Sequence, residues 1–255
     1  MTLVGVEFDL QLPSDVPSDT WSLFRIVKAE AVRLERCTLT VTQQQDDPDT
    51  EVAVFRLEDT PIIFTGAANV VSEIELQDCI ARGEADLVRV KGPVPVAITW
   101  SNGLLATSRR LLEATGTGIQ AEDESAGIEL ELNHVTAAMQ EGLCLLNETQ
   151  RTPSLGPVKI RVTNCILVVD PEYPLIEQQG PMRSSELRKL VEWRGDRNFY
   201  EGFQTFWEIH GLDQDNEPQK MTLRTWQSFW GGGEDNLPNY RRVGWETPPP
   251  LDRPF

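Results

Sequence analysis

The sequence predicts an all-β protein made of stacked coils of parallel strands, closed at its C-terminal end by a short, partly helical cap. Two observations predict this fold. Apolar residues recur at positions i, i+2, i+5 and i+7 of an eight-residue pattern, and the copies are spaced along the chain as in a solenoid. Five of the seven tryptophans also lie in the last quarter of the 255 residues, where this pattern stops.

Each copy of the pattern predicts a strand, a bend and a second strand. Residues i and i+2 point to one face of a strand, and the step of three to i+5 requires a bend if the next pair is to face the same interior. We call i, i+2, i+5 and i+7 the interior positions. The copies begin at Met1, Val32, Ile74, Ile98, Leu130 and Ile160.

The bend falls at i+4, which most copies fill with a residue that tolerates left-handed backbone. Gly5, Asp78, Asn102 and Asn164 suit this conformation, whereas the bend residues of two other copies fit it less well. These two residues are Arg36 and His134.

The cysteines support the repeat. Cys37, Cys79 and Cys165 all occupy position i+5, so we expect them to stack inside the coils as reduced thiols. Cys144 is interpreted as an ordinary strand residue. Their spacing predicts no metal site, and no Cys-x-x-Cys motif is present.

Further short strands are expected between the copies, so that each coil has about three sides. These strands are predicted at residues 23–27, 52–57, 62–65, 87–90, 142–146 and 174–177. Polar or Gly- and Pro-containing stretches at 43–50, 113–127 and 147–156 are expected to form outward loops, and a short helix is expected at 108–114.

Three phrases resemble coils of right-handed parallel β-helix proteins of the pectin-lyase-like kind: "VRLERCTLTV", "IELQDCIARG" and "IRVTNCILVV". The chain is also similar to β-helical C-terminal regions of large multidomain bacterial proteins. The resemblance implies a right-handed parallel β-helix of six or seven coils over residues 1–200. Some such bacterial proteins carry a kinase domain upstream, but this sequence contains no kinase motif.

The pattern fails one interval after Ile160, because Val191 and Trp193 fit the first two interior positions but Asp196 and Asn198 would occupy the other two. We therefore expect the solenoid to end near residue 200 and residues 201–255 to form a capping segment with a Pro-rich tail. Leu223, Trp226 and Trp230 lie at helical spacing, which predicts a helix at 221–230 with Thr222 as its N-cap. The tryptophans of this region, Trp193, Trp207, Trp226 and Trp230, are interpreted as a cap in preference to a stacking platform for sugar rings.

The charge balance excludes one class of partner. The chain has 23 basic and 40 acidic residues, a net charge of −17, so binding to the phosphates of nucleic acid is not expected. The sequence predicts no membrane span and shows no signal peptide, which favours a cytoplasmic location.

We predict no catalytic, cofactor-binding or metal-binding residue. Neither His134 nor His210 is spaced for a hydrolase triad. The acidic run Asp213, Asp215 and Glu217 lacks the glycine and the final glutamate of a calcium loop, because Pro218 and Arg224 stand at those two positions.

Since parallel β-helices often act on polysaccharides, charged residues need a separate test. Asp46 and Asp47, Arg89 and Lys91, and His210 resemble pieces of pectin-hydrolase motifs, but their order along the chain is wrong. No interior position repeats a charge. The sequence therefore favours a non-catalytic interaction or scaffold region that binds a protein or glycan along one face. The alternative is a carbohydrate-binding or carbohydrate-active β-helix.

The N-terminal end is expected to be bare, because Met1 itself fills an interior position. This end would then be covered by an upstream domain or by another copy of the chain.

Overall fold

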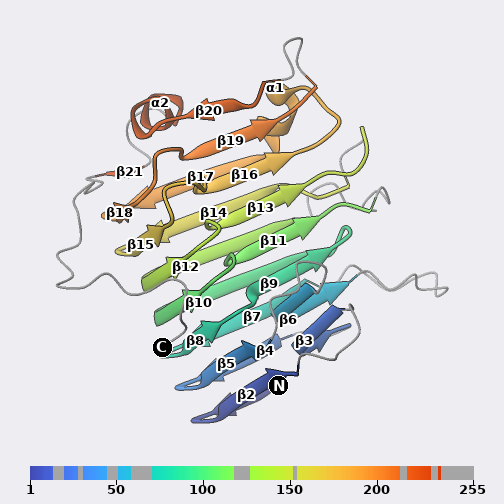
Figure 1. Ribbon diagram of the computed structural model, residues 1–255, viewed down its shortest axis with the longest axis vertical. Coiled ribbons are helices and arrows are strands. Elements are labelled where there is room, and N and C mark those ends of the chain that lie inside the picture. Colours follow the sequence, from blue (N-terminus) through green and yellow to red (C-terminus); the bar gives the residue numbers. More distant parts are fainter. Residues whose placement is uncertain are drawn as a thin grey trace.

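A computed structural model describes residues 1–13, 20–27, 31–44, 51–58, 71–117, 127–151, 154–212, 217–230 and 235–236. These residues form a parallel β-solenoid, in which the strands lie one above another along the long axis of the molecule (Figure 1). Strands predominate, and the helices are short, so the predicted fold class is confirmed. In the described part of the chain, neither helix is long and apolar enough to span a membrane.

Each coil has three sides, which we call a, b and c. Sides a and b belong to one 13-stranded sheet, and side c is a separate eight-stranded sheet. Side a contains β1 (Thr2–Val4), β4 (Ala31–Glu35), β7 (Ser72–Gln77), β14 (Val158–Thr163) and β17 (Val191–Asp196). Side b contains β2 (Glu7–Leu12), β5 (Thr38–Gln43), β8 (Ile80–Gly83), β15 (Ile166–Val169) and β18 (Phe199–Glu201).

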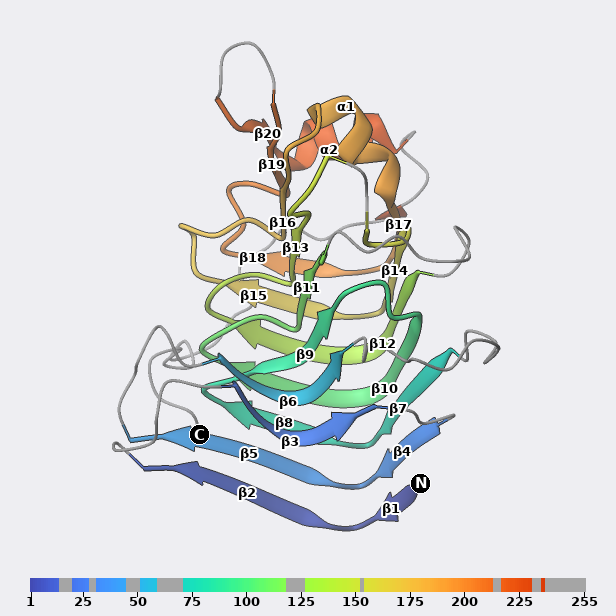
Figure 2. The ribbon, with the colours of Figure 1, turned by 90° about the vertical axis from the view of Figure 1, so that its right-hand side faces the viewer.

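Two strands are long enough to form both sides, and Figure 2 shows them curving through the bend. They are β10 (Val96–Thr107) and β12 (Ile128–Met139). Side c contains β3 (Thr20–Ile26), β6 (Glu51–Glu58), β9 (Asp86–Lys91), β11 (Leu112–Thr115), β13 (Cys144–Asn147), β16 (Ile176–Gln179) and β19 (Trp207–His210). In the described residues the strands named here stack seven deep on each side and form seven successive coils.

The strand register confirms the eight-residue pattern. Position i+2 of all six predicted copies lies in one column, in which each residue pairs with its equivalent in the next coil: Leu3, Leu34, Leu76, Trp100, Leu132 and Val162. The side chains at the interior positions of coils 2 to 6 that are not glycine are buried. The three cysteines of position i+5 are reduced and buried, as expected, and Cys144 lies in β13.

The bend is a column of left-handed residues. Gly5 has a φ of 64°, and the bend residues Arg36, Asp78, Asn102, His134, Asn164 and Arg197 have φ values between 53° and 56°. The bend therefore occurs in every coil, including the two whose residue suits it less well.

The expectation that the pattern ends after Ile160 is wrong, because the structure contains a seventh copy that is shifted by two residues. Trp193 pairs with Ile160 and Gly195 with Val162, so Trp193 takes position i. Asn198 then takes position i+5 and Tyr200 position i+7, and both are buried. Parallel pairing continues to Trp207–His210, which completes side c of this coil.

Asn198 is accepted inside the solenoid because its amide group is hydrogen-bonded. Its Oδ1 accepts a hydrogen bond from the Cys165 amide at 2.9 Å, and its Nδ2 donates to the Val162 carbonyl at 2.9 Å. A buried polar group with partners avoids the cost of desolvation.

The predicted helix at 108–114 is also wrong. Residues Leu112–Thr115 form strand β11, which pairs with β9 and β13. Leu112 and Ala114 point inward with the period of two of a strand, and this tertiary pairing overrides the local helix preference. The predicted strand at 62–65 lies outside the described residues.

The C-terminal end is covered by short elements. These are α1 (Ser184–Leu187), a 3-10 turn (Arg188–Leu190), β20 (Gln219–Met221), α2 (Leu223–Phe229) and β21 (Asp235–Asn236). The helix predicted at 221–230 corresponds to α2, with Thr222 at its N-cap position.

A cluster of aromatic rings lies between α2 and the last coil. Trp193, Trp207 and Trp226 are fully buried, and the Trp226 ring lies 5.2 Å from that of Trp193 and 5.7 Å from that of Trp207. These three rings have no exposed face on which a sugar could stack, so they form a cap.

Candidate functional site

Charged side chains form a row along the outer face of side c. Strand register places Arg25, Arg56, Arg89 and Glu113 next to one another in successive coils. Leu145 comes next, and Glu177 and Glu208 follow it in the same row. This row lies on side c, outside the eight-residue pattern, so it leaves untouched the expectation that no interior position repeats a charge.

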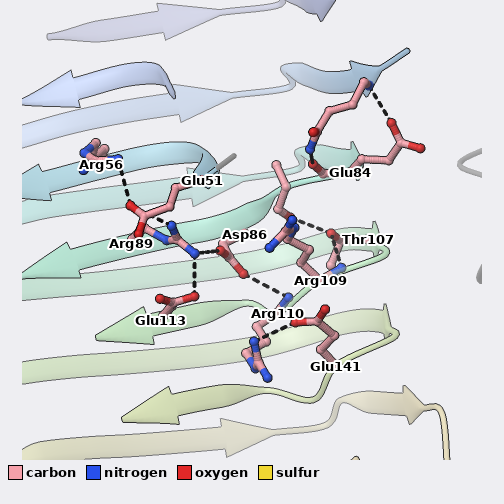
Figure 3. A network of polar contacts seen from close by, with 12 residues as sticks. Glu51, Arg56, Glu84, Asp86, Arg89, Thr107, Arg109, Arg110, Glu113 and Glu141 are labelled. Carbon is pink, nitrogen blue, oxygen red and sulfur yellow. Dashed lines mark hydrogen bonds and ion pairs between the residues drawn. The ribbon is translucent and has the colours of Figure 1, made fainter. Parts of the chain in front are cut away.

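The arginines lie among carboxylates (Figure 3). Arg89 contacts three of them: its Nη1 lies 2.9 Å from Glu51, and its Nη2 lies 3.0 Å from Asp86 and 2.6 Å from Glu113. Arg56 donates from Nε to Glu58 Oε1 at 2.6 Å and lies 3.5 Å from Glu51. The like charges of Arg56 and Arg89 are therefore bridged by Glu51.

The centre of this network is closed to solvent, although the Glu51 side chain is 45% exposed. The Asp86 side chain is fully buried, and those of Arg56 and Arg89 are 6% and 9% exposed. Burial raises the pKa of Asp86 to about 6, although the charge of Arg89 opposes this shift. The acidic neighbours of Arg89 raise its pKa despite burial, so the guanidinium stays charged.

A second part of the network lies further along side c. The Asp86 carboxylate accepts a hydrogen bond from the Arg110 amide at 3.2 Å, and the Arg110 side chain pairs with Glu141 at 2.6 Å and with Glu177 at 3.4 Å. His210, the last residue of β19, lies 3.2 Å from Glu208, whose other oxygen pairs with Lys220 at 3.0 Å. His210 is thus the terminal residue of a strand.

These contacts argue against catalysis at the network. A general acid or base must be within hydrogen-bond reach of the substrate. Asp86 has the one carboxyl pKa here that is raised toward neutrality, but it faces Arg89 and the Arg110 amide in the interior. The network is best described as an electrostatic connection between coils.

An open hollow lies on a different face, the outer face of side a. It has a volume of about 310 Å³ and lies over β12, β14 and β17. The hollow is lined by Glu129, Glu131, Lys159, Arg161, Glu192 and Arg194, with Leu130 and Ile160 beneath them. We call these six charged residues the charged hollow.

The six side chains of the charged hollow are accessible, with exposed fractions between 47% and 62%. They form three ion pairs: Lys159 with Glu129 at 2.8 Å, Arg161 with Glu131 at 3.4 Å and Arg194 with Glu192 at 2.9 Å. Exposed pairs of this kind contribute about 0–1 kcal/mol each, so a ligand can replace them at little cost.

The other residues considered in the sequence do not join either site. Lys91 is exposed at the end of β9, and His134 is an exposed bend residue whose Nδ1 lies 2.7 Å from Asn133 Oδ1. Asp46, Asp47, Asp213 and Asp215 lie outside the described residues. Among the residues that are described, no group of three or more His, Cys, Asp or Glu side chains is placed to hold a metal ion.

The charged hollow was missed because its residues are separated by a full coil in sequence. Glu129, Lys159 and Glu192 become neighbours through register alone. The available signal was the alternation of charged and apolar residues in "IELEL", "VKIRV" and "VEWRG".

No family model, curated protein or solved structure matches this chain.

Proposed function

We propose that this chain is a non-catalytic β-solenoid interaction region whose binding face is the charged hollow. The single observation that carries the proposal is an open hollow of about 310 Å³ lined by three acidic and three basic side chains from three successive coils. The partner is a segment of another protein that carries both signs of charge, because such a segment can exchange ion pairs with the hollow.

The charge pattern disfavours a second copy of the chain as this partner. If two hollows faced each other across a two-fold axis along the strands, centred on β14, Glu129 would oppose Glu192 and Lys159 would oppose itself. An axis along the solenoid would place Glu129 opposite Glu131 and Lys159 opposite Arg161. Both arrangements bring together more like charges than opposite ones.

The chemistry of the hollow also bears on glycans. Among the described residues, no aromatic side chain lines the hollow, so these residues offer a neutral sugar no ring on which to stack. The equal numbers of acidic and basic groups give an acidic polysaccharide no net attraction, and the charge of the whole chain opposes it. A pectin-lyase-like activity is therefore the less favoured alternative.

The test compares binding with turnover. A labelled peptide of alternating lysine and glutamate, and polygalacturonate as the acidic glycan, are titrated against the protein at low and moderate salt. We expect the peptide to bind and salt to weaken it. The double variant Lys159→Glu with Arg161→Glu should reduce its affinity by about tenfold or more, as expected for the loss of about 1.4 kcal/mol.

Arg33→Glu is the matched control, because Arg33 lies on the same face in β4 and pairs with Glu75 outside the hollow. This variant should bind the peptide as the original protein does. Failure of the peptide to bind, or equal binding by the double variant, would contradict the proposed face. Cleavage of polygalacturonate would instead support the enzymatic alternative.

A further inference from the structure

Side b carries an apolar outer face over its later coils. The outward residues of β8, β10, β12, β15 and β18 form two rows in register. We call the apolar residues of these two rows, together with Thr136, the apolar stripe. Its members are Ile80, Leu104, Ala106, Thr136, Ala138, Ile166, Val168 and Phe199.

The middle of the apolar stripe has unusually low exposure for an outer face. Ala106, Ala138 and Val168 are 7%, 5% and 8% exposed, although they point away from the interior. Thr40 and Arg82, which lie in the same row nearer the N-terminus, are half-buried. The elements in close contact with β15 are β12 and β18, its own neighbours in the sheet.

The end of the described chain lies next to this stripe. Strand β21 pairs with β17 and places Asn236 beside Asp196, three residues before Phe199 (Figure 1). Residues 237–255 follow. We propose that the apolar stripe is the docking surface for this C-terminal segment of the same chain.

The composition of 237–255 suits an apolar sheet face. The outer face of a sheet offers side chains and no free backbone acceptors, so a segment lying on it gains little from amide donors. Five prolines of this segment have no amide hydrogen, and Tyr240, Trp245, Leu251 and Phe255 supply apolar surface. A proline-rich segment is also already extended, which lowers the entropy lost on docking.

The C-terminal segment 237–255 is long enough to cross the apolar stripe. Nineteen residues (255 − 236) in an extended proline-rich conformation reach roughly 59 Å at about 3.1 Å per residue. The stripe crosses five coils, a distance of about 19 Å at roughly 4.8 Å between strands. The segment can therefore cross the whole stripe.

A single introduced thiol tests the proposal in the full chain. The four native cysteines are buried, so Trp245→Cys adds the one thiol expected to react quickly with a maleimide when the segment is undocked. We expect its labelling to be at least tenfold slower than that of a synthetic peptide 237–255 with the same substitution. Adding Ala138→Asp to the stripe should restore the peptide's rate.

Thr40→Asp is the control, since Thr40 lies in the same outward row but outside the stripe, and it should leave the labelling slow. If Ala138→Asp unfolds the protein, the native cysteines will label too, and Val168→Ser then replaces it as a milder change. Labelling at the peptide's rate without any stripe substitution would overturn the proposal. So would sedimentation as a dimer that Ala138→Asp dissociates, because the occupant would then be a second copy.

Discussion

Arg36, His134 and Arg197 hold left-handed backbone at the bend, although their β-carbons make this conformation unfavourable. The neighbouring coils impose it, since the bend amides of Gly5, Arg36, Asp78 and Asn164 donate to carbonyls of the next coil at 2.8 to 3.1 Å. The repeated backbone path thus holds left-handed conformation at residues that do not favour it on their own.

At the interior positions, by contrast, side-chain volume decides which residues fit. Trp100 replaces the leucine found at position i+2 in neighbouring coils, and Gly103 follows at i+5, where the other coils have cysteine, valine or, in the seventh copy, asparagine. A β-carbon added to Gly103 would lie 1.9 Å from Trp100 Nε1. The indole therefore occupies the space of two side chains.

Gly103→Ala should destabilise the fold by about 1–3 kcal/mol, the cost of overpacking a core. Trp100→Leu together with Gly103→Val should recover most of that loss, because this pair occurs as Leu132 and Val135 one coil away. Denaturant unfolding of the three proteins measures both effects. Equal stability of Gly103→Ala and the original chain would mean that the indole can move aside.

The cysteines should be unreactive toward thiol reagents in the native protein. Burial raises the pKa of Cys79, Cys144 and Cys165, which lowers their thiolate fraction. A hydroxyl at position 79 would have acceptors within reach, because the Cys79 thiol lies 3.3 Å from the Leu34 carbonyl and 3.2 Å from that of Gln77. Cys79→Ser should therefore cost about 1 kcal/mol, near the lower end of the range for buried polar groups. Maleimide labelling and thermal unfolding check the two expectations, and rapid native labelling would contradict the first.

At the scale of the elements, strand register decides which charged side chains of side a lie next to one another in successive coils. In the row Glu129, Lys159 and Glu192 the sign alternates from one coil to the next, whereas the adjacent row Glu131, Arg161 and Arg194 stacks two arginines. Side c instead stacks Arg25, Arg56 and Arg89 and places acidic side chains between them. The buried network there couples coil packing to pH through Asp86.

The pH dependence has a definite sign. The pKa of Asp86 is raised from its ordinary value of 3.8 to about 6, so the folded state binds this proton more tightly than the unfolded state. The stability contributed by the proton is present below about pH 4 and is lost as pH rises through about 6. Asp86→Asn cannot titrate, so the difference in unfolding free energy between the original protein and this variant should fall over that interval.

Asp9→Asn on the exposed outer face of β2 is the control for replacing a carboxylate by an amide. Urea unfolding at several pH values between 4 and 7 gives the comparison. A difference that rises with pH would mean that pairing with Arg89 outweighs the burial of Asp86.

The C-terminal cap should be essential to stability. Trp226 is fully buried and contacts the rings of Trp193, Phe206, Trp207 and Trp230. Trp226→Ala should cost about 3–5 kcal/mol, as for other large buried rings. Arg224→Ala, on the exposed face of the same helix, should change stability by less than about 0.5 kcal/mol. A small effect of Trp226→Ala in thermal unfolding would mean that the last coil is stable without α2.

The sequence predicted most elements because interior positions carry one repeated pattern, but it failed where an element depended on its neighbours. The seventh copy was missed because it has Trp193 at position i, a glycine, Gly195, at position i+2 and the polar Asn198 at position i+5. The other copies have medium-sized apolar side chains at most of these positions. Strand β11 was missed because its four residues gain their conformation from β9 and β13. The charged hollow could not be found, since the number of residues between coils varies and outward neighbours cannot then be matched by counting.

At the scale of the whole molecule, the two ends differ. In the first coil Leu3, Val6, Phe8 and Leu10 are only partly buried, and among the described residues β1, β2 and β3 each pair on one side. The last coil is covered by the aromatic cap. A solenoid is stabilised by contacts between adjacent coils, so its stability should decrease toward the first coil.

Hydrogen exchange should therefore begin at the N-terminal coil. Amides of β2 and β3 should exchange at lower opening free energy than those of β13 and β16, which have neighbours on both sides. Mass spectrometry of peptides from the exchanged protein resolves these segments. Faster exchange in β13 and β16 than in β2 would show that the middle of the stack opens independently.

The column of bends also has an evolutionary consequence. The interval between equivalent positions ranges from 24 residues, between Leu76 and Trp100, to 42, between Leu34 and Leu76, yet both coils return to the same backbone path. Insertions between bends are absorbed by the connections and leave the stack unchanged. A gene segment encoding one coil could therefore be duplicated or lost in a single event, lengthening or shortening the molecule by about 4.8 Å while keeping its cross-section.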